Sequence, residues 1–496
     1  MHSCRYDSGR MAFARSALLV LVAVAAFTAV SAQNATAPAP AAAAPATAAT
    51  KYNATLVGHA LIPANTFQAP PADAPAQLNV SCKYCSGTNG NRRIDTLGAF
   101  VGTDGNGTVV RPTGLSYPFV GQPLQGLSGI KTLGNGTYLH LQDNGFGNKP
   151  NSPDLILQAY VTQPNFGAGN VTLLKTIFLN DPDKKVPFLI KNEYTSKRYL
   201  TGSDFDIESI QPVGTSYWFG DEFGPYLLEV NAADGKVLNF YDTVVPGLGA
   251  VRSPDNDKLI LPNPDASLPV YELKHSKGFE GMAQSPDGRY LYPLLEGPLW
   301  NYTAKTYEKT PAGKEFLRIM QFDLSIRNFT STTYKYPLET NGNAIGDFNM
   351  VDATRGMIIE RDNGAGDRAN ACTPGTTTTN CFDTPALLKR IYMINLNNTD
   401  ADGFLVKNSY IDLLDIADPN AVSRVPLVGG RFTFPFVTIE SVDVSNATAG
   451  QIIVCNDNNL PFSAGRVPNQ VDNNEFIILS VPEFLRSNAG GSVISS

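Results

Sequence analysis

One pattern of strands and acidic turns recurs along most of this chain, and it restricts the possible folds more than any other feature. Each copy begins with a short apolar element that contains Ser or an acidic residue, and roughly 13–17 residues later a strand ends in an acidic turn rich in Gly or Asn. Successive copies lie 67 to 93 residues apart, and their lead residues are Ser128, Glu208, Glu280, Asp347 and Glu440. This period is too long for a β-hairpin but fits one four-stranded propeller blade with its loops.

Composition and local pattern agree with an all-β fold. The chain has 496 residues, of which 43 are Gly, 35 Pro, 20 Tyr and 26 Phe, as expected for many short strands joined by tight turns. Further strands outside the repeated pairs are predicted at residues 226–230, 317–322 and 390–395. The five copies together with residues 51–125 therefore predict a β-propeller-like fold of about six blades, with five or seven blades as alternatives.

The first 50 residues are expected to lie outside this fold. Arg10 and Arg15 precede a 14-residue apolar run at residues 17–30, and small residues follow the run. These features predict a secretory signal peptide over residues 1–32, because the run is shorter than the about 20 residues that a transmembrane helix needs. Residues 33–50 are mostly Ala, Pro and Thr and predict a disordered tether. The folded domain is predicted to span residues 51–496, without stable membrane insertion.

Potential glycosylation sites favour the same compartment. The chain contains ten Asn-x-Ser/Thr sequons, at Asn34, Asn53, Asn79, Asn106, Asn135, Asn170, Asn301, Asn328, Asn397 and Asn446. A single sequon carries little weight, but ten of them behind a signal peptide favour a secreted, extracellular glycoprotein.

Four of the five cysteines that follow the signal peptide are expected to form disulfides. Cys372 and Cys381 flank a polar loop that a bridge would close. Cys82 and Cys85 have the spacing of a redox pair, of half a zinc site or of a small-loop disulfide. Because the chain has no second Cys pair and no His cluster, the disulfide is favoured. Cys455 lies in an apolar strand and is expected to be a buried thiol.

Charge and motif content exclude several classes of function. The formal net charge is −7 and no Lys/Arg-rich run occurs, so nucleic acid is not expected as a partner. The chain has only four His, and it contains no Gly-x-Ser-x-Gly elbow, P-loop, dinucleotide-binding fingerprint or His-Glu-x-x-His motif. Its chemistry therefore depends on none of these common catalytic motifs.

The recurring acids would be brought together around the axis of a propeller. Carboxylates there would repel one another, so cations or hydrogen-bond donors must compensate them. Oxygen ligands without His or Cys suit Ca²⁺ best, and the predicted metal ligands are Asp143, Asp221, Glu296 and Asp457. The alternative is that each acid caps its own turn by accepting hydrogen bonds from local backbone N–H groups.

Several short segments, taken in their order along the chain, carry a resemblance to a known family. They are Gly126-Leu127-Ser128-Gly129, Asp143-Asn144-Gly145-Phe146-Gly147, Asp206-Ile207-Glu208, Gly220-Asp221-Glu222-Phe223-Gly224-Pro225, Gly278-Phe279-Glu280-Gly281-Met282, Ile359-Glu360-Arg361-Asp362 and Asn456-Asp457-Asn458-Asn459-Leu460-Pro461. Over about residues 56–485 the sequence resembles the phytase-like family described as "esterase-like activity of phytase". One position departs from the family, since Ser209 stands where a Gly is usual.

The resemblance implies a secreted, propeller-like hydrolase of a small-molecule ester or phosphoester, assisted by a metal. Its motif positions make Glu208, Glu222 and Glu280 candidate catalytic residues. Arg361 is a candidate clamp for an oxyanion, although its acidic neighbours equally predict a salt bridge. The alternative function is a non-catalytic extracellular propeller that binds a ligand or associates with a cell-wall or matrix component, which the Ala/Pro/Thr tether would suit.

Overall fold

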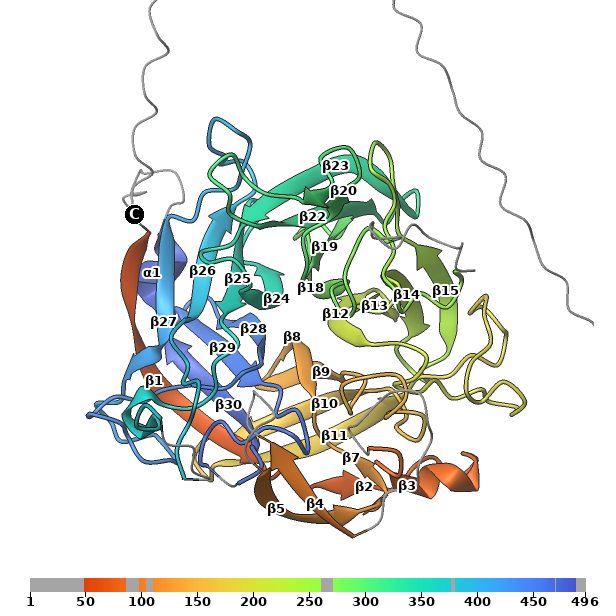
Figure 1. Ribbon diagram of the computed structural model, residues 1–496, viewed down its shortest axis with the longest axis horizontal. Coiled ribbons are helices and arrows are strands. Elements are labelled where there is room, and N and C mark those ends of the chain that lie inside the picture. The colour runs from red at the N-terminus through yellow and green to blue at the C-terminus, as the bar shows by residue number, and fades with distance from the viewer. Residues whose placement is uncertain are drawn as a thin grey trace, which may run out of the picture. The chain divides into compact units, whose positions relative to one another are not determined.

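In the computed structural model, twenty of the described strands form five groups of four antiparallel strands, which we call blades 1 to 5 (Figure 1). Blade 1 contains β8 (Leu127–Gly134), β9 (Thr137–Gln142), β10 (Gln158–Asn165) and β11 (Asn170–Phe178). Blade 2 contains β12 (Ile207–Val213), β13 (Ser216–Asp221), β14 (Tyr226–Asn231) and β15 (Val237–Asp242). Blade 3 contains β18 (Phe279–Gln284), β19 (Tyr290–Leu295), β22 (Phe316–Asp323) and β23 (Asn328–Pro337).

Blades 4 and 5 complete the set. Blade 4 contains β24 (Ala344–Met350), β25 (Arg355–Arg361), β26 (Lys389–Asn395) and β27 (Ser409–Ala417). Blade 5 contains β28 (Ile439–Asn446), β29 (Gln451–Asn456) and β30 (Asn474–Ser480), and its fourth strand is β1 (Thr50–Ile62) from the start of the domain. The last blade is therefore closed by the first strand of the described residues. Blades 2 and 3 are separate sheets, whereas β1 also pairs in parallel with β11 and β27 and so joins blades 1, 4 and 5 into one twelve-stranded sheet.

The structure describes residues 49–85, 98–103, 110–259, 271–375, 380–468 and 470–487. All of them belong to one of two units of the chain, Thr47–Ser496. The predicted signal peptide and nearly all of the predicted tether lie outside the described residues.

The remaining described elements are short. They are β2 (Phe67–Gln68) paired with β7 (Gln122–Pro123), β3 (Val80–Ser81) with β6 (Phe119–Val120), β4 (Gly98–Thr103) with β5 (Val110–Tyr117), β16 (Val244–Val245) with β17 (Gly249–Ala250), β20 (Trp300–Asn301) with β21 (Thr306–Tyr307), two 3₁₀ turns at Ala76–Asn79 and Arg368–Asn370, and α1 (Pro482–Arg486). No helix among the described residues is both long and apolar enough to span a bilayer.

The all-β, propeller-like fold is confirmed, but the count of six blades is not. Residues 51–125 were expected to form a blade of their own. Instead β1 pairs with β30 in blade 5, and the described part of the remainder forms three two-stranded sheets. All five repeated sequence pairs are the two innermost strands of a blade, from β8–β9 to β28–β29. The pairings in the described residues thus make five blades, one of the alternatives that the sequence left open.

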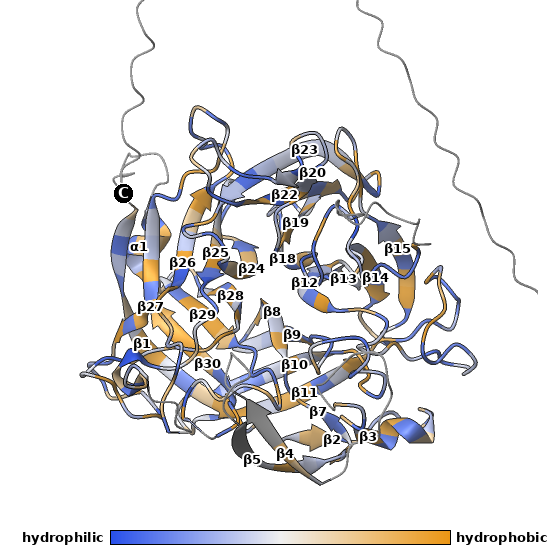
Figure 2. Ribbon diagram, in the orientation of Figure 1, coloured by the Kyte–Doolittle hydropathy of each residue, from blue (hydrophilic) through white to orange (hydrophobic). Residues whose placement is uncertain are grey.

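The innermost strands form a closed ring. β8 contacts β12, β12 contacts β18, β18 contacts β24, β24 contacts β28, and β28 returns to β8 (Figure 1). A separate apolar cluster lies between each pair of neighbouring blades. Met282 of blade 3 packs with Trp218 of blade 2, for example, and Ile453 of blade 5 packs with Ile130 of blade 1. Because both faces of an inner strand are covered, strands such as β26 and β29 are apolar along most of their length (Figure 2).

The cysteine predictions agree with the structure. Cys372 and Cys381 form a disulfide, and so do Cys82 and Cys85, which favours the disulfide over the redox and zinc alternatives for that pair. Cys455 is a fully buried free thiol in β29.

Candidate active site

Equivalent residues of the five blades meet near the propeller axis. In four blades the two inner strands begin their pairing at corresponding residues: Leu127 with Gln142, Ile207 with Asp221, Phe279 with Leu295, and Ile439 with Asn456. In blade 4 the pairing begins one pair earlier, at Ala344 with Arg361, and the corresponding pair is Ile345 with Glu360, directly before the register shift. The residues that follow on the first strands are Ser128, Glu208, Glu280, Gly346 and Glu440. Those that follow on the second strands are Asp143, Glu222, Glu296, Arg361 and Asp457. The repeat therefore presents acids from every blade except blade 4, where it presents Gly346 and Arg361.

Three of these acids occupy β-bulges. The register shifts between Ile207 and Ser209, between Phe279 and Gly281, and between Ile439 and Ser441, so Glu208, Glu280 and Glu440 have no partner residue in the ladder. A bulge leaves one residue unpaired and redirects its side chain. The same local irregularity in three blades therefore turns three glutamates out of the sheet in an equivalent way.

Blade 4 shows why the lead residue predicted there, Asp347, is not part of this set. The equivalent position is Gly346, where a Cβ atom would lie 1.9 Å from the carbonyl oxygen of Ile439, so a side chain has no room. The Asp347 carboxylate instead accepts hydrogen bonds from the backbone N–H groups of Phe348 and Val442. It ties blade 4 to blade 5 and does not join the other acids.

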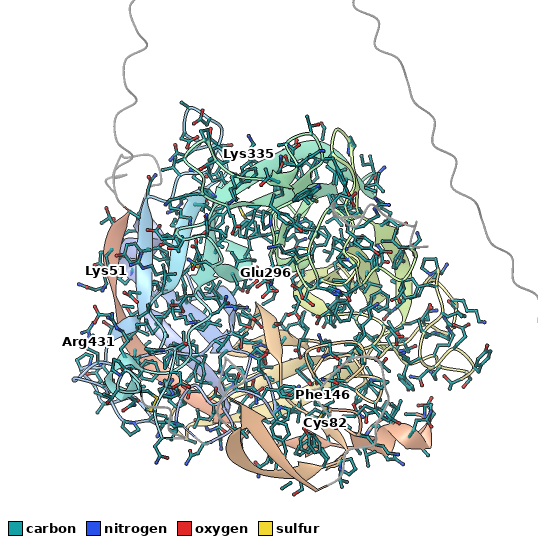
Figure 3. All side chains as sticks on the ribbon, viewed as in Figure 1. Lys51, Cys82, Phe146, Glu296, Lys335 and Arg431 are labelled. Carbon is teal, nitrogen blue, oxygen red and sulfur yellow. A yellow bond between two sulfur atoms is a disulfide. The ribbon has the colours of Figure 1, made fainter. Side chains whose placement is uncertain are left out.

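Six carboxylates approach closely enough to share cations. Three groups of three have ligand oxygens within 4.8 Å of one another: Asp206 with Glu208 and Glu222, Glu208 with Glu280 and Glu440, and Glu222 with Glu280 and Glu296. Two more acids lie close by: Asp143 helps to raise the pKa of Glu208, and Asp457 helps to raise the pKa of Asp143. We call these eight residues the acidic cluster: Asp143, Asp206, Glu208, Glu222, Glu280, Glu296, Glu440 and Asp457. All eight are buried, and Figure 3 shows Glu296 at the centre of the ring of blades.

Two cations and a hydroxyl compensate part of this charge. The Arg361 Nη2 atom lies 2.8 Å from Glu440 Oε1, 3.5 Å from Glu296 Oε1 and 3.8 Å from Glu280 Oε1. The Lys277 ammonium group forms an ion pair with Glu296. Ser128 Oγ donates a hydrogen bond to Glu440 Oε2 at 2.8 Å. These contacts concentrate on the acids of blades 3 and 5.

The crowding shifts the proton affinities of the cluster. Burial, followed by repulsion from neighbouring carboxylates, raises the pKa of Glu208, Glu222 and Glu280 well above the ordinary value. Burial alone would also raise the pKa of Glu296, but Lys277 and Arg361 outweigh it and lower that pKa. Because their pKa values are raised, the metal-free Glu208, Glu222 and Glu280 retain protons at pH values at which free carboxyl groups lose them.

The turn-capping alternative holds for three of the predicted metal ligands. Asp143 accepts a hydrogen bond from Gly145 N, and Asp457 accepts one from Asn459 N. Both oxygens of Asp221 accept backbone N–H bonds, from Asp206 and Gly224, and burial raises its pKa to about 8. Asp143 and Asp457 still belong to the acidic cluster, whereas Asp221 is absent from the three groups above.

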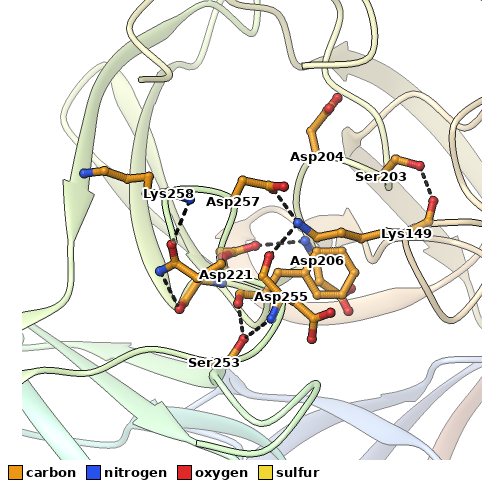
Figure 4. A network of polar contacts seen from close by, with 12 residues as sticks. Lys149, Ser203, Asp204, Asp206, Asp221, Ser253, Asp255, Asp257 and Lys258 are labelled. Atoms are coloured by element: carbon orange, nitrogen blue, oxygen red, sulfur yellow. Dashed lines mark hydrogen bonds and ion pairs between the residues drawn. The ribbon is translucent and has the colours of Figure 1, made fainter. Parts of the chain in front are cut away.

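Asp221 lies in a second polar network at the side of blade 2 (Figure 4). There the Lys149 ammonium group donates to the Asp255 carbonyl oxygen and pairs with Asp257, while Asn144 donates two hydrogen bonds to Asp206. Asp206 therefore links this network to the acidic cluster.

The structure brings together the three predicted catalytic acids, Glu208, Glu222 and Glu280, with Arg361 and Glu296. None of the three acids accepts a backbone hydrogen bond among the described residues, so turn capping does not explain them. Sequence reasoning did not assign Asp206, Glu440 or Lys277 to the site. Asp206 and Glu440 lie in the repeat and were within reach of the pattern, but a lysine directly before β18 carries no such signal.

A surface cavity elsewhere in the described residues is separate from this site. It has a volume of about 290 Å³ and lies beside the β20–β21 hairpin, where Tyr307, Phe316, Arg318, Lys335 and Phe404 line it. None of its lining residues belongs to the acidic cluster.

Comparison with solved structures finds proteins of low similarity. A luciferin-regenerating enzyme is 10% identical, with a TM-score of 0.29, over 72% of this chain and 92% of its own. A putative 6-phosphogluconolactonase from Bacteroides fragilis is 11% identical, with a TM-score of 0.27, over 76% and 97%. The Cps50 (Swd1) β-propeller domain from Myceliophteria thermophila is 8% identical, with a TM-score of 0.29, over 72% and 97%. At these values the fold assignment rests on the strand pairings themselves.

Family assignment comes from the sequence. Among curated proteins, none matches this chain. The profile of the phytase-like family, described as esterase-like activity of phytase, matches residues 122–460, which include all eight members of the acidic cluster and Arg361. Because the match covers more than half of the chain, this protein belongs to the phytase-like family described as "esterase-like activity of phytase".

Proposed function

We propose that the protein is a secreted, metal-assisted hydrolase of a small-molecule ester or phosphoester and that the acidic cluster is its active site. The observation that carries the proposal is the gathering of eight buried carboxylates with two paired cations among the described residues, Arg361 and Lys277, in a family described by esterase-like activity. Buried charge of one sign is costly unless it is compensated, so such a cluster needs a cation or retained protons.

The residues fit a divalent cation with hard oxygen ligands. Glu280 is only 4% exposed, and its Oε1 atom has no hydrogen-bond partner among the described residues, so it is free to ligate. Asp206, Glu208 and Glu222 offer three more oxygens close together. The set contains carboxylates only, which suits Ca²⁺ better than zinc or copper. When bound, the ion would supply positive charge that offsets the negative charge developing on an ester or phosphoester in the transition state.

The protein side chains would divide the remaining work. Glu296, which Lys277 and Arg361 keep ionised, can accept a proton from an attacking water molecule. Glu296 can then pass this proton to the leaving oxygen, which leaves Glu222 as a ligand of the ion. Arg361 is committed to three carboxylates, which favours a role in organising the site over a role as an oxyanion clamp.

Two features support secretion. The two disulfides favour an oxidising compartment. Eight sequon asparagines fall within the described residues and all are exposed, as N-glycosylation requires: Asn53, Asn79, Asn135, Asn170, Asn301, Asn328, Asn397 and Asn446. The sequons at Asn34 and Asn106 lie outside the described residues. Glycosidase treatment of the secreted protein should lower its apparent mass, and an unchanged mass would count against glycosylation.

The proposed activity is tested with a panel of phosphomonoesters, carboxylic esters and lactones. We expect turnover of at least one class in the presence of Ca²⁺, loss of turnover after EGTA, and recovery when Ca²⁺ is restored. Turnover that EGTA leaves unchanged would remove the metal from the proposal. No turnover of any class by folded, calcium-loaded protein would favour a binding function.

One surface segment favours binding of an acidic polysaccharide as a second candidate function. In the loop at residues 182–197, Tyr194 is 98% exposed to solvent and Leu189 is 78% exposed. Exposed lysines surround them in the sequence, at Lys184, Lys185, Lys191 and Lys197. A flat ring among positive charges suits uronate or sulfate-bearing sugars of a cell wall or matrix.

This candidate makes a separate prediction. Replacing Lys185, Lys191 and Lys197 together by Gln should release the protein from an immobilised polyuronate at low salt and leave ester turnover unchanged. Equal retention of the triple variant and the wild type would refute this binding surface.

A further inference from the structure

We propose that Arg361 takes the place of a second metal ion, so that the acidic cluster binds one divalent cation, on its blade 2 side. This inference rests on the proposed function, because it assumes that the cluster binds a divalent cation at all. It adds how many ions bind, where the ion lies, and which residue determines both.

Blade 4 differs from the other four blades in the residues that it places near the axis. Blades 1, 2, 3 and 5 place an acid directly after the second strand, at Asp143, Glu222, Glu296 and Asp457. Blade 4 has Arg361, the last residue of β25, at the corresponding position, one residue beyond Glu360 of the Ile345–Glu360 pair. At the matching position on the first strand blade 4 has Gly346, where the Ile439 carbonyl leaves no space for an acid. Blade 4 therefore contributes a cation and no carboxylate.

Arg361 lies close to three carboxylates of the acidic cluster. Within one guanidinium group, Arg361 Nη2 lies 2.8 to 3.8 Å from carboxylate oxygens of Glu440, Glu296 and Glu280. A second cation, Lys277, pairs with Glu296. Two of the three groups of neighbouring acids, those containing Glu440 and Glu296, thus already include an acid that a protein cation holds.

The blade 2 side of the acidic cluster differs from the side that Arg361 and Lys277 occupy. Among the described residues, Asp206, Glu208 and Glu222 form no ion pair with Lys or Arg, although their oxygens lie within 4.8 Å of one another. Glu280 stands between the two halves. Its Oε1 atom is buried without a hydrogen-bond partner and is 3.8 Å from Arg361, which is too far for a hydrogen bond. Glu280 also shares one group of neighbouring acids with Glu208 and another with Glu222, so it can add a ligand on this side of the cluster.

An arginine is suited to this role because it cannot lose its proton. A buried lysine can become neutral and then yield its position to a metal ion, but the guanidinium group keeps its charge at any physiological pH. Because Arg361 stays positive beside Glu280, Glu296 and Glu440, it repels a second divalent ion there and holds those carboxylates in place when the metal is absent.

The test counts calcium ions bound to the full secreted chain by isothermal titration after removal of metal. We expect one ion for the wild type and two for Arg361→Gln, which removes the charge. Arg327→Gln is the matched control, since Arg327 pairs with Glu229 far from the cluster, and it should bind one ion. Circular dichroism shows whether each variant is folded.

Three outcomes would overturn the inference. Two or more ions bound by the wild type would show that Arg361 does not replace one, and one ion bound by folded Arg361→Gln would show the same. If Arg361→Gln does not fold, the location of the ion is tested instead by the calcium affinity of two other variants. Glu208→Gln should weaken calcium binding at least tenfold, and Glu440→Gln less than threefold. The reverse order would refute the placement of the ion on the blade 2 side. A wild type that binds no calcium would instead refute the metal in the proposed function.

Discussion

Replacing Glu208 by Gln should separate metal binding from folding. Glu208 belongs to two of the three groups of neighbouring acids, with Asp206 and Glu222 and with Glu280 and Glu440. It accepts no backbone hydrogen bond and occupies a bulge, so the substitution keeps the volume and removes one negative charge without breaking a turn. Its raised pKa means that the charged form is disfavoured in the metal-free protein. A neutral side chain should therefore leave the metal-free protein as stable as the wild type, or more stable.

The effect on the calcium-bound protein should be opposite. Two unit charges about 4 Å apart interact by about 4 kcal/mol at an effective dielectric constant of about 20. If half of this is lost, calcium binds about 30-fold more weakly, since each factor of ten corresponds to about 1.4 kcal/mol. At an ion concentration about 100 times the wild-type Kd, binding stabilises the wild type by about 2.7 kcal/mol and the variant by about 0.9 kcal/mol.

The assay is denaturant unfolding of both proteins in EGTA and in Ca²⁺. Glu483→Gln is the control, because Glu483 is exposed on α1 and should keep the full calcium-dependent gain. Equal gains for Glu208→Gln and the wild type would refute the claim that Glu208 ligates the ion. A loss of more than about 2 kcal/mol in EGTA would show that the Glu208 charge holds the fold together instead.

Three further results are expected. In EGTA, the free energy of unfolding should fall as pH rises from about 4 to 7, because acids such as Glu208 and Glu280 have raised pKa values in the folded protein and bind more protons there than in the unfolded chain. Burial likewise raises the pKa of Asp347 to about 7. Saturating Ca²⁺ should flatten this slope, and a free energy of unfolding that rises with pH in EGTA would contradict the expectation. Gly346→Ala should lower the free energy of unfolding by about 3 kcal/mol, because its Cβ would meet the Ile439 carbonyl. Gly167→Ala is the control, since its Cβ would meet its nearest neighbour at 3.4 Å and should change stability by less than about 0.5 kcal/mol. Denaturant unfolding compares the two variants, and equal losses would refute the close approach at Gly346. Replacing both Cys372 and Cys381 by Ala should cost about 2–3 kcal/mol in the same assay, and an unchanged midpoint would show that the bridge does not constrain the loop.

The repeated hairpins were predictable because their signal is local. An apolar strand, an acidic turn and a second strand lie within a few dozen residues, and all five copies became inner strand pairs. The count of six blades is not confirmed, because β1 pairs with β30, which lies more than 400 residues later in the chain. Nothing in residues 50–62 specifies a distant partner, so the N-terminal segment was read as the start of its own blade.

The acids of the site were predictable, but their roles were not. Asp143, Asp221 and Asp457 have short side chains that reach the backbone two or three residues along, and they cap turns. The longer Glu208, Glu222 and Glu280 make no such bonds and meet near the axis. Sequence spacing also could not separate Asp347 from Gly346, because the bulges that align the blades appear only in the strand register.

The central claim is that the buried glutamates near the axis bind a metal ion used in hydrolysis. The most direct measurement is turnover of the substrate class found active, in saturating Ca²⁺, for Glu208→Gln, Glu222→Gln and Glu280→Gln beside the wild type. We predict that each variant stays folded and loses turnover by about a hundredfold, which corresponds to about 2.7 kcal/mol in the barrier. Three folded variants with wild-type calcium affinity and full turnover would contradict the account.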